Sequence, residues 1–585
     1  MLVVLLAVWV LVFIRLAYVQ LWRWKYYDRA ALAQHTDSLQ LAPERGRLFD
    51  RLGRPLTLND AFYVLDVWPQ KLATKDSLAG VLARAGLGTR AVVRAELERH
   101  RERFTYPVEL GEFQADSLWR SIVRARFGKC TEVRSECRRV YPFGASTAGV
   151  VGFCGKDGGL AGLESWYDSV LSGRPGWALM QREGSGLCVP YPGYPRVEPV
   201  PGASIRLTLD ADVQEICFRA LAAGVERTRA KSGSAVVLDA KSGAILALAN
   251  WPSFEPDRFR DFEKPLYRCK PLCDEFEPGS SFKVVVAATA LESPNRDALL
   301  GRTYDVSAGY IEVAGYKIGD AHNHGILDFD GLLVMSSNPG CALLSFELDR
   351  NLYYRIGQGL GFGRGLGIGY PGEAGGRLDK PANLNRLRLA NIAFGQGVTV
   401  NLVQLTAAYL CVANNGTYVK PYLVSAVQCG GVDWQRPART ETRQVLARGT
   451  TERLKDILRK VVTEGTGTPA AIPGIDACGK TGTAQKVEPW GKYSETRSLM
   501  SFVGFFPKDR PKYVVGVVVD EPGTERFAST SAGPVFAEIG QRLLLLDQMR
   551  ERESLIADHR RLQNASSAIQ NPKSKIQNPA LAVTR

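Results

Sequence analysis

The chain has 585 residues, too many for one ordinary domain, and its length suggests about two to four. Apolar residues make up 45% of it, so large cores can form, and its net charge is +14. The basic residues are spread along the whole chain, which argues against a dedicated nucleic-acid surface and fits work near an anionic envelope surface or polymer. None of the 11 cysteines forms a C-x-x-C pair, which argues against zinc-ribbon and thioredoxin-like folds.

The chain begins with an apolar segment. Residues 1–14 carry no charged side chain, and residues 16–22 extend the segment past Arg15 to the roughly 20 residues that cross a membrane. Aromatic side chains typical of a membrane interface follow, namely Trp22, Trp24, Tyr26 and Tyr27. A cleaved signal peptide would need a basic start and a small-residue cleavage site, and the segment has neither. We therefore expect a transmembrane anchor over residues 1–22.

The charges that flank this anchor leave its orientation open. All of them follow the span, so the positive-inside rule taken literally would place the bulk of the protein in the cytoplasm. A short basic leader missing from the start of the sequence would remove this conflict and would also explain the short span. We interpret the pattern in that second way.

Residues 23–201 are expected to form a separate module of mixed secondary structure. The module is rich in arginine, with an alternating strand pattern at 62–68 and a helical pattern at 89–104. A Pro- and Gly-rich passage at 189–203 marks its end.

A larger domain is expected over residues 202–547. It begins with an alternating strand at 204–210, a helix at about 211–228 and a β-hairpin at 232–250. Helices and strands then alternate, with many glycines in the loops, which is typical of an α/β domain. The tail, 548–585, starts with a charged helical piece and repeats Ile-Gln-Asn-Pro, and we expect it to be disordered.

The first candidate catalytic residues lie in the stretch PGSSFK. Pro278-Gly279 predicts a turn from which a helix can start at or after Ser280. In a helix, Lys283 shares a face with Ser280 at i+3, whereas Ser281 points elsewhere. A lysine whose pKa is lowered by burial can remove the proton of a serine hydroxyl and make it a nucleophile. A helix cap followed by a surface lysine would give the same S-x-x-K pattern.

Two later motifs strengthen the catalytic interpretation. Ser336 and Asn338 form an S-x-N triplet, and Lys480, Thr481, Gly482 and Thr483 form K-T-G-T. Each motif alone fits an ordinary loop or strand. The three together, in this order, are the motif set of β-lactamases and penicillin-binding proteins.

The chain resembles a class B penicillin-binding protein, a monofunctional D,D-transpeptidase of the bacterial cell wall. The resemblance reaches from the anchor to about residue 545 and includes RGRLFDRLGRPL at 45–56, GLAGLE at 159–164, FGQGVTV, EGTGT and SFVGFFP. It implies an α/β (α+β) penicillin-binding/β-lactamase-like transpeptidase domain with a central antiparallel sheet flanked by helices. This domain would be preceded by a transmembrane helix and an elongated mixed α+β pedestal of the dimerisation type.

The resemblance also implies catalytic roles. Ser280 would attack the penultimate D-Ala carbonyl of a stem pentapeptide and release the terminal D-Ala. Lys283 would act as general base, and Ser336 would relay the proton to the leaving amine. Asn338 would hydrogen-bond the substrate backbone.

The K-T-G-T strand would bind the donor peptide. Lys480 would keep the site electropositive, help to lower the pKa of Lys283 and attract the substrate carboxylate, which Thr481 and Thr483 would bind. The backbone N–H groups of Ser280 and Thr483 would form the oxyanion hole. Gly482, without a side chain, would let a peptide approach and pair with the strand. An amine of a neighbouring stem would then form the cross-link.

The sequence departs from the family pattern in small ways. Ser281 stands where threonine is commonest, and Pro339, which restricts the backbone after Asn338, stands where relatives often have Val or Thr. The S-x-N form and the compact length favour the septal, cell-division branch over the elongation branch.

Several rival functions fit the sequence less well. A Ser-His-Asp hydrolase is disfavoured because only five histidines occur and G-x-S-x-G is missing. The stretch DAHNHG at 320–325 could suggest a metal site, but a polar loop is the simpler interpretation. A β-lactamase would need a deacylating base such as E-x-x-L-N, and a bifunctional synthase a glycosyltransferase domain, and we find neither. A D,D-carboxypeptidase and a non-catalytic penicillin-binding sensor or scaffold remain as alternatives.

The family resemblance implies a location and partners. We expect a single-pass protein of the cytoplasmic (inner) membrane with its catalytic domain on the extracytoplasmic, periplasmic side. Its ligands would be peptidoglycan stem peptides ending in D-Ala-D-Ala, and β-lactams as covalent inhibitors. Its protein partners would be a polytopic glycan polymerase and divisome proteins. We expect no cofactor, no metal and no nucleic acid.

Overall fold

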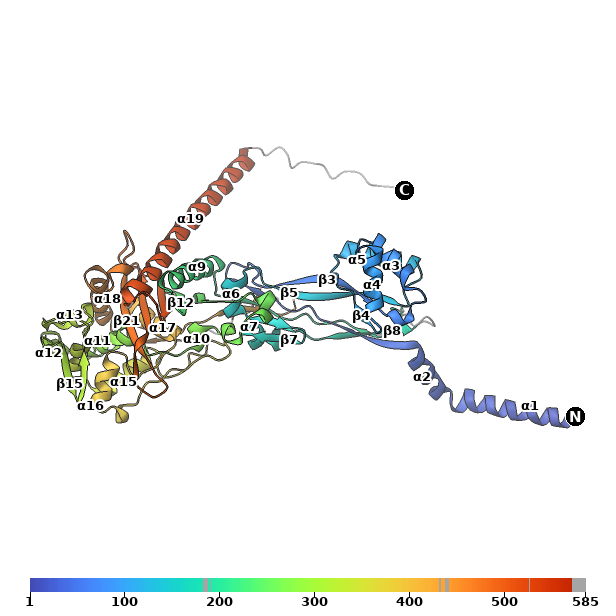
Figure 1. Cartoon of the computed structure of the whole chain (residues 1–585), viewed down its shortest axis with the longest axis horizontal. Coiled ribbons are helices and arrows are strands. Elements are labelled where there is room, and N and C mark those ends of the chain that lie inside the picture. Colours follow the sequence, from blue (N-terminus) through green and yellow to red (C-terminus); the bar gives the residue numbers. More distant parts are fainter. Residues whose placement is uncertain (183–187, 191, 431–432, 437–440, 526, 571–585) are drawn as a thin grey trace. The chain divides into compact units, whose positions relative to one another are not determined.

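The computed structural model describes residues 1–182, 188–190, 192–430, 433–436, 441–525 and 527–570 (Figure 1). The chain forms two compact units, and neither is continuous in sequence. The N-terminal unit comprises residues 1–144, 151–207 and 424–437, and the C-terminal unit comprises residues 145–150, 208–423 and 438–585.

An exposed apolar helix begins the N-terminal unit. α1 (Leu2–Ala17) continues into a π-helical turn, Tyr18–Trp22, and together they are long and apolar enough to cross a membrane. None of the side chains of α1 is buried in the protein. Because the exposure of so long an apolar surface to water is unfavourable, the helix fits the single-pass anchor that the sequence predicts. α2 (Trp24–His35) follows.

A small α+β core follows the anchor within the same unit. β3 (Leu58–Val67) and β5 (Thr131–Val140) pair antiparallel over ten residues, with the short β4 (Phe104–Thr105) on the other edge of β3. Their apolar residues share a core with three helices, α3 (Lys75–Arg84), α4 (Arg90–Arg99) and α5 (Glu112–Arg124). The predicted strand at 62–68 lies in β3, and the predicted helix at 89–104 is α4, which ends earlier, at Arg99.

A buried ion network joins the two N-terminal sequence boxes. Glu164, in α7 (Gly162–Trp166), is fully buried and accepts hydrogen bonds from Arg45 Nε at 2.8 Å and Arg139 Nε at 2.7 Å. Arg45 also pairs with Asp168 at 2.7 Å. The box at 45–56 and the box at 159–164 therefore meet through ion pairs around the buried Glu164. A charge that is removed from water needs a partner of opposite charge.

Other strands complete the N-terminal unit. They are β1 (Thr36–Leu41), β2 (Leu48–Phe49), β6 (Phe153–Gly155), β7 (Gly158–Ala161), β8 (Gly176–Arg182), β9 (Cys188–Pro190), β10 (Arg196–Val197), β11 (Ser204–Leu207) and β19 (Val424–Gln428). β11, the strand predicted at 204–210, lies between β19 and β2.

The C-terminal unit is built on a five-stranded antiparallel sheet. Its order is β13-β12-β23-β22-β21, with β12 (Ser232–Asp239), β13 (Ile245–Trp251), β21 (Cys478–Val487), β22 (Tyr493–Phe506) and β23 (Tyr513–Asp520). β12 and β13 are the predicted hairpin. β21, which carries K-T-G-T, is an edge strand of this sheet.

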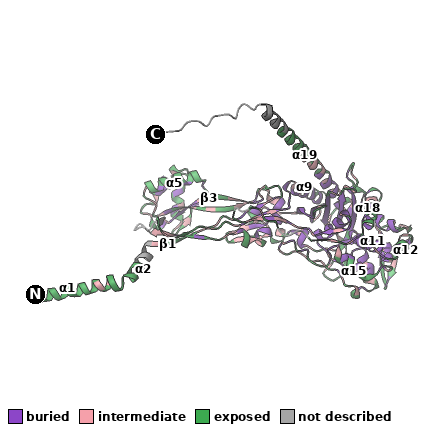
Figure 2. Cartoon of the chain, turned by 180° about the vertical axis from the view of Figure 1, so that it is seen from behind, coloured by how far each residue is buried: buried purple, intermediate pink, exposed green. Residues whose placement is uncertain are grey.

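Helices cover both faces of this sheet. α9 (Ala211–Thr228) and α19 (Ala528–Gln570) share a core with alternate residues of the strands, such as Val515 and Val517. α17 (Leu402–Ala413) packs against Gly516, which points to the opposite face, and α18 (Arg448–Thr463) packs along β21. Figure 2 shows many buried residues, in purple, around α9 and α18. This is the fold class that the resemblance implied, a central antiparallel sheet flanked by helices.

Further helices and short strands belong to the C-terminal unit. They are α6 (Gly144–Val151), α10 (Lys270–Cys273), α11 (Lys283–Leu291), α12 (Arg296–Leu300), α13 (Phe329–Val334), α14 (Asn338–Ser345), α15 (Arg350–Gly359), α16 (Arg386–Ala393), and the short strands β14 (Tyr304–Asp305), β15 (Tyr310–Val313), β16 (Tyr316–Gly319), β17 (Ile326–Leu327), β18 (Thr417–Val419) and β20 (Thr442–Gln444).

The last helix passes the expected end of the domain. α19 continues through residue 548 to Gln570, so the first part of the expected disordered tail is helical. Arg550 of this helix pairs with Asp210 and Asp212 at the start of α9, each at 2.7 Å. Residues 571–585 lie outside the described residues.

Candidate active site

Ser280 lies in a tight turn at the edge of a large cavity. Gly279–Phe282 form a single 3-10 turn and α11 starts at Lys283, which fits the prediction of a helix that starts at or after Ser280. Ser280 lines a cavity of about 770 Å³. Ser281 is fully buried, and its hydroxyl donates to the Pro278 carbonyl at 2.6 Å. Of the two serines, only Ser280 therefore faces the cavity.

Two buried lysines meet at Ser336. Lys480 Nζ donates to Ser336 Oγ at 2.8 Å, and Lys283 Nζ lies 3.4 Å from the same oxygen. Lys283 Nζ also donates to the Ser336 carbonyl and, at 2.8 Å, to Asn338 Oδ1. Among the described residues no hydrogen bond joins Lys283 to Ser280, although helical phase predicted that they are neighbours. Catalytic hydrogen bonds often tighten only when substrate is bound.

Burial changes the proton affinity of this pair. It lowers the pKa of Lys283, while the Asp320 carboxylate acts in the opposite direction. Burial and the adjacent Lys283 ammonium hold the pKa of Lys480 well below its usual range. Because two ammonium groups so close together repel each other, the pair gives up a proton more easily than either lysine would in water, and a neutral amine can act as a base.

The S-x-N turn is held by a carboxylate that the sequence analysis did not assign to the site. Asp320 accepts hydrogen bonds from the Asn338 backbone N–H and from Ser337 Oγ, both at 2.6 Å. Ser336 has a left-handed backbone, with φ +61°, which is a strained conformation for a residue other than glycine. Pro339 lies in the first turn of α14, where a proline fits a helix, so the departure at this position is accommodated.

The K-T-G-T strand forms part of the cavity wall. Thr481 and Thr483 line the cavity, while Lys480 is fully buried. Thr481 Oγ1 lies 2.9 Å from the hydroxyl of Thr466, a second residue that the three motifs do not include. Thr466 belongs to EGTGT, a family box in the sequence, and that box was the available signal.

Gly482 lies where the serine turn comes close to β21. A Cβ atom at this position would lie 2.6 Å from the Pro278 carbonyl oxygen and 2.4 Å from Ser501 Oγ. The missing side chain therefore makes room for the serine turn. Its role in the approach of a peptide to the edge strand β21 stays a prediction.

Comparisons with known proteins agree with this geometry. Residues 233–541 match the penicillin binding protein transpeptidase domain, and residues 40–207 match the penicillin-binding protein dimerisation domain. The chain is 30% identical to stage V sporulation protein D of Bacillus subtilis, over 90% of this chain and 82% of the relative. It is also 30% identical to a probable peptidoglycan D,D-transpeptidase, PbpC, of Pseudomonas aeruginosa, over 90% of each chain.

A solved structure extends the likeness to three dimensions. Penicillin binding protein 3 from Mycobacterium tuberculosis, in complex with aztreonam, is 26% identical, with a TM-score of 0.68 over 87% of this chain and 97% of that chain. Together with the family match over more than half of the sequence, this places the chain in the class B penicillin-binding proteins. It is an enzyme of the serine-type peptidoglycan D,D-transpeptidase family, whose members include β-lactam-binding proteins.

Proposed function

We propose that this chain cross-links peptidoglycan stem peptides through an acyl-enzyme on Ser280. The oxygen of Ser280 attacks the penultimate D-Ala carbonyl, an ester forms, and the terminal D-Ala leaves with its amine protonated. The amine of a second stem then attacks the ester, which restores the Ser280 hydroxyl and leaves a new amide bond. The observation that carries the proposal is the Ser336 hydroxyl between the two buried lysines, beside Ser280 in one cavity.

Each motif residue has a role in this proposal. Lys283, as the neutral amine, takes the proton of Ser280, and Ser336 passes it to the leaving amine. Asn338 hydrogen-bonds the donor backbone, and Lys480 keeps Ser336 oriented and attracts the substrate carboxylate.

The donor peptide is held on β21. Thr481 and Thr483 bind its terminal carboxylate, and its backbone pairs with the free edge of the strand. The N–H groups of Ser280 and Thr483 form the oxyanion hole, where loss of one donor typically costs about 3–4 kcal/mol of transition-state stabilisation. Gly482 keeps the serine turn close to this strand.

The proposal extends to domains and location. Residues 1–22 anchor the chain, 23–201 form the pedestal, and 202–547 form the transpeptidase domain, to which we add Arg550. The catalytic domain lies on the outer side of the cytoplasmic membrane, where its substrate is found. The S-x-N form supports a role in septal wall synthesis, with a polytopic glycan polymerase and division proteins as partners.

Labelling with a fluorescent penicillin tests the nucleophile. We expect the full chain to be labelled, Ser281→Ala to be labelled like it, and Ser280→Ala to lose labelling. Labelling of Ser280→Ala would refute the assignment. Muropeptide analysis then separates the alternatives: cross-linked products support transpeptidation, trimmed stems alone support a D,D-carboxypeptidase, and unchanged stems support a sensor or scaffold.

A further inference from the structure

The serine turn is held on both sides of Ser280, by different parts of the chain. After Ser280, the Tyr409 hydroxyl donates to the Ser281 carbonyl at 2.8 Å. Before Ser280, the turn lies against residues 394–400, which have the sequence FGQGVTV. We call these residues the FGQG loop. None of the three catalytic motifs includes them.

The FGQG loop contacts the backbone that leads into Ser280. Phe276 and Val400 exchange both of their backbone hydrogen bonds, each at 3.0 Å. The Gly279 N–H donates to the Gly395 carbonyl at 3.2 Å. A Cβ at Gly395, where φ is +81°, would lie 2.1 Å from the Gly279 carbonyl oxygen. The loop therefore touches the residue just before Ser280, and a glycine is needed for so close an approach.

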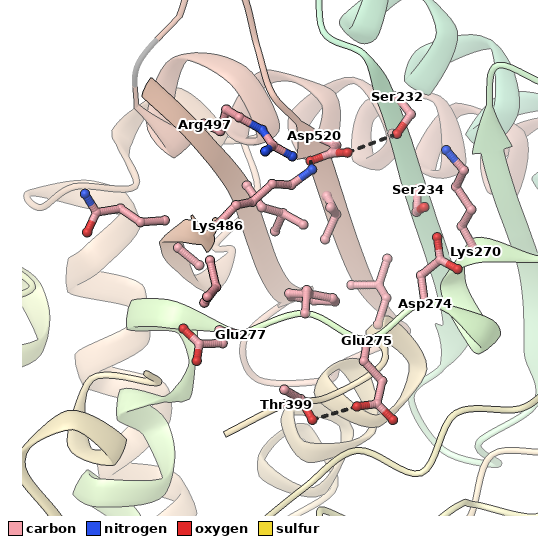
Figure 3. Close-up of a pocket in the computed structure, with 18 of the residues that line it drawn as sticks. Ser232, Ser234, Lys270, Asp274, Glu275, Glu277, Thr399, Lys486, Arg497 and Asp520 are labelled. Carbon is pink, nitrogen blue, oxygen red and sulfur yellow. Dashed lines mark hydrogen bonds and ion pairs between the residues drawn. The ribbon is translucent and has the colours of Figure 1, made fainter. Parts of the chain in front are cut away.

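Glu277 attaches the middle of the loop to the serine segment. Its Oε1 accepts from the Gly397 N–H at 2.8 Å and, less closely, from the Tyr493 hydroxyl at 3.3 Å. Its buried Oε2 has no hydrogen-bond partner among the described residues, so the attachment uses one oxygen. Tyr493 begins β22, which extends the attachment to the central sheet. Figure 3 shows Glu277 and, on the same segment, Glu275, which accepts from Thr399 of the loop at 2.7 Å.

Burial makes the two hydrogen bonds of this carboxyl important. It raises the pKa of Glu277, while the Gly397 N–H and the Tyr493 hydroxyl act in the opposite direction. Burial and the adjacent Glu277 carboxylate raise the pKa of Tyr493, so the tyrosine keeps the proton that it donates. Hydrogen bonds to a partly desolvated carboxyl are costly to lose. Without Glu277, the Gly397 N–H would lose its acceptor.

A displacement of Glu277 would be passed on to Ser280. Only Pro278 and Gly279 separate the two residues. The ring of a proline fixes its φ angle, and the N–H of Gly279 is bound to Gly395 of the loop. This short segment therefore has little freedom to absorb a shift before it reaches the nucleophile.

We propose that Glu277 is a positioning residue for acylation, which holds the FGQG loop against the serine turn through the Gly397 N–H and so keeps Ser280 in its place. The same loop carries Gln396, which lines the cavity together with Ser280. The inference rests on the proposed nucleophile and adds a residue outside the three motifs. Glu277 itself does not line that cavity. It should therefore affect the rate of acylation and not the binding of a β-lactam.

Stopped-flow acylation of the detergent-solubilised full chain by a chromogenic β-lactam tests the proposal. It separates the acylation rate constant from the dissociation constant of the preceding complex, and the burst amplitude counts the active molecules. Glu277→Met keeps a similar volume and removes both oxygens. We expect acylation to slow by about tenfold to a hundredfold, because a small displacement of a reacting group is expensive. The dissociation constant should stay within about twofold.

Three further variants separate positioning from a general loss of structure. Glu277→Gln keeps an acceptor oxygen and should retain at least about a third of the rate constant. Tyr493→Phe removes only the longer hydrogen bond, so it should slow acylation by about threefold and have no effect when added to Glu277→Met. Asp274→Ala is the control, because it removes a carboxylate of the same segment whose ion pair with Arg268 is exposed. It should leave both constants unchanged.

Several results would overturn the role of Glu277. They are an acylation rate constant of Glu277→Met within about twofold of the unmodified chain, a change confined to the dissociation constant, a Glu277→Gln chain as slow as Glu277→Met, and an equal loss in Asp274→Ala. If Glu277→Met gives no burst, Tyr493→Phe decides, and unchanged acylation by that variant overturns the proposal. Failure of the proposed function differs from all of these: the unmodified chain would not be acylated, or acylation would survive Ser280→Ala.

Discussion

The Ser336 hydroxyl lies between two amines that cannot both remain charged at low cost. Lys480 is 2.8 Å from Ser336 Oγ and Lys283 is 3.4 Å from it, and both side chains are fully buried. Burial alone favours the neutral amine, and the mutual repulsion adds to it. The same arrangement that makes the charged state costly favours a neutral amine, and a neutral amine is what the proposed base requires.

The rate of acylation should therefore depend on pH in a defined direction. Only a neutral Lys283 can accept a proton, so acylation by a penicillin should slow as the pH falls through the lowered pKa of the lysine pair. The midpoint should lie below the usual lysine value of about 10.4. Stopped-flow acylation with a chromogenic β-lactam measures it, and thermal unfolding at each pH excludes loss of the fold. A midpoint at or above 10.4 would contradict the role of Lys283 as the base.

At the scale of elements, the site depends on how closely the serine turn approaches β21. A Cβ at Gly482 would meet a backbone carbonyl of the turn, and a Cβ at Gly279 would meet the Thr483 carbonyl at 2.4 Å. Two glycines, one on each element, therefore allow the backbones to come into contact. Both carbonyls belong to the backbone, so they cannot move aside as a flexible side chain could.

Gly482→Ala should push the two elements apart. We expect a loss of about 1–3 kcal/mol of stability from overpacking and a fall in penicillin acylation of about a hundredfold, because a small displacement of a catalytic group is expensive. Gly449→Ala in α18 is a matched control, since a Cβ there meets nothing within 4 Å. It should leave acylation unchanged and stability equal or slightly higher. Normal acylation by a folded Gly482→Ala chain would argue against this role of the glycine.

Short sequence patterns predicted single helices, hairpins and turns of the catalytic unit. The pattern of residues 211–228 predicted α9, and two apolar runs joined by a Lys-Ser-Gly turn predicted the hairpin of β12 and β13. Helical phase separated Ser280 from Ser281, although both lie in a 3-10 turn that precedes α11. Asp320 and Thr466 were missed because each acts on a partner distant in sequence, and no spacing rule links a loop carboxylate to the start of α14. Gly482 was recognised as important, but only the packed structure shows what occupies its space.

At the scale of the whole molecule, the N-terminal unit has its own source of stability. The buried Glu164 lies between Arg45 and Arg139 and forms an ion pair with each guanidinium group. A buried pair contributes little over an apolar replacement, but removing one member leaves the other charges without compensation.

Glu164→Gln should therefore destabilise the N-terminal unit by about 3–5 kcal/mol. Calorimetry of the detergent-solubilised chain measures the change, and penicillin labelling of the folded fraction should persist, since Glu164 lies outside the cavity with Ser280. Glu109→Gln serves as the control because its pair with Arg138 is exposed, and it should cost less than about 1 kcal/mol. Equal effects of the two changes would refute the importance of burial.

Buried ion pairs also indicate where the catalytic unit ends. The family match stops at residue 541 and composition suggested a boundary at 547, but Arg550 of α19 forms ion pairs with Asp210 and Asp212, and Asp210 is almost fully buried. Asp210 also caps α9, which packs on the central sheet, so losing the ion pair with Arg550 weakens the start of that helix.

A chain that ends at residue 547 should therefore be less stable than one that ends at residue 561, by about 2–4 kcal/mol, the cost of removing an ion-pair partner from a buried carboxylate. Arg550→Ala in the longer chain should reproduce the loss, and Arg552→Ala, a change in the same exposed helix, should not. Urea unfolding followed by penicillin labelling of the remaining folded protein measures all four proteins. If the two truncations are equally stable, the ion pairs contribute nothing and the unit ends before them; if Arg550→Ala alone matches the shorter chain, the domain extends to Arg550.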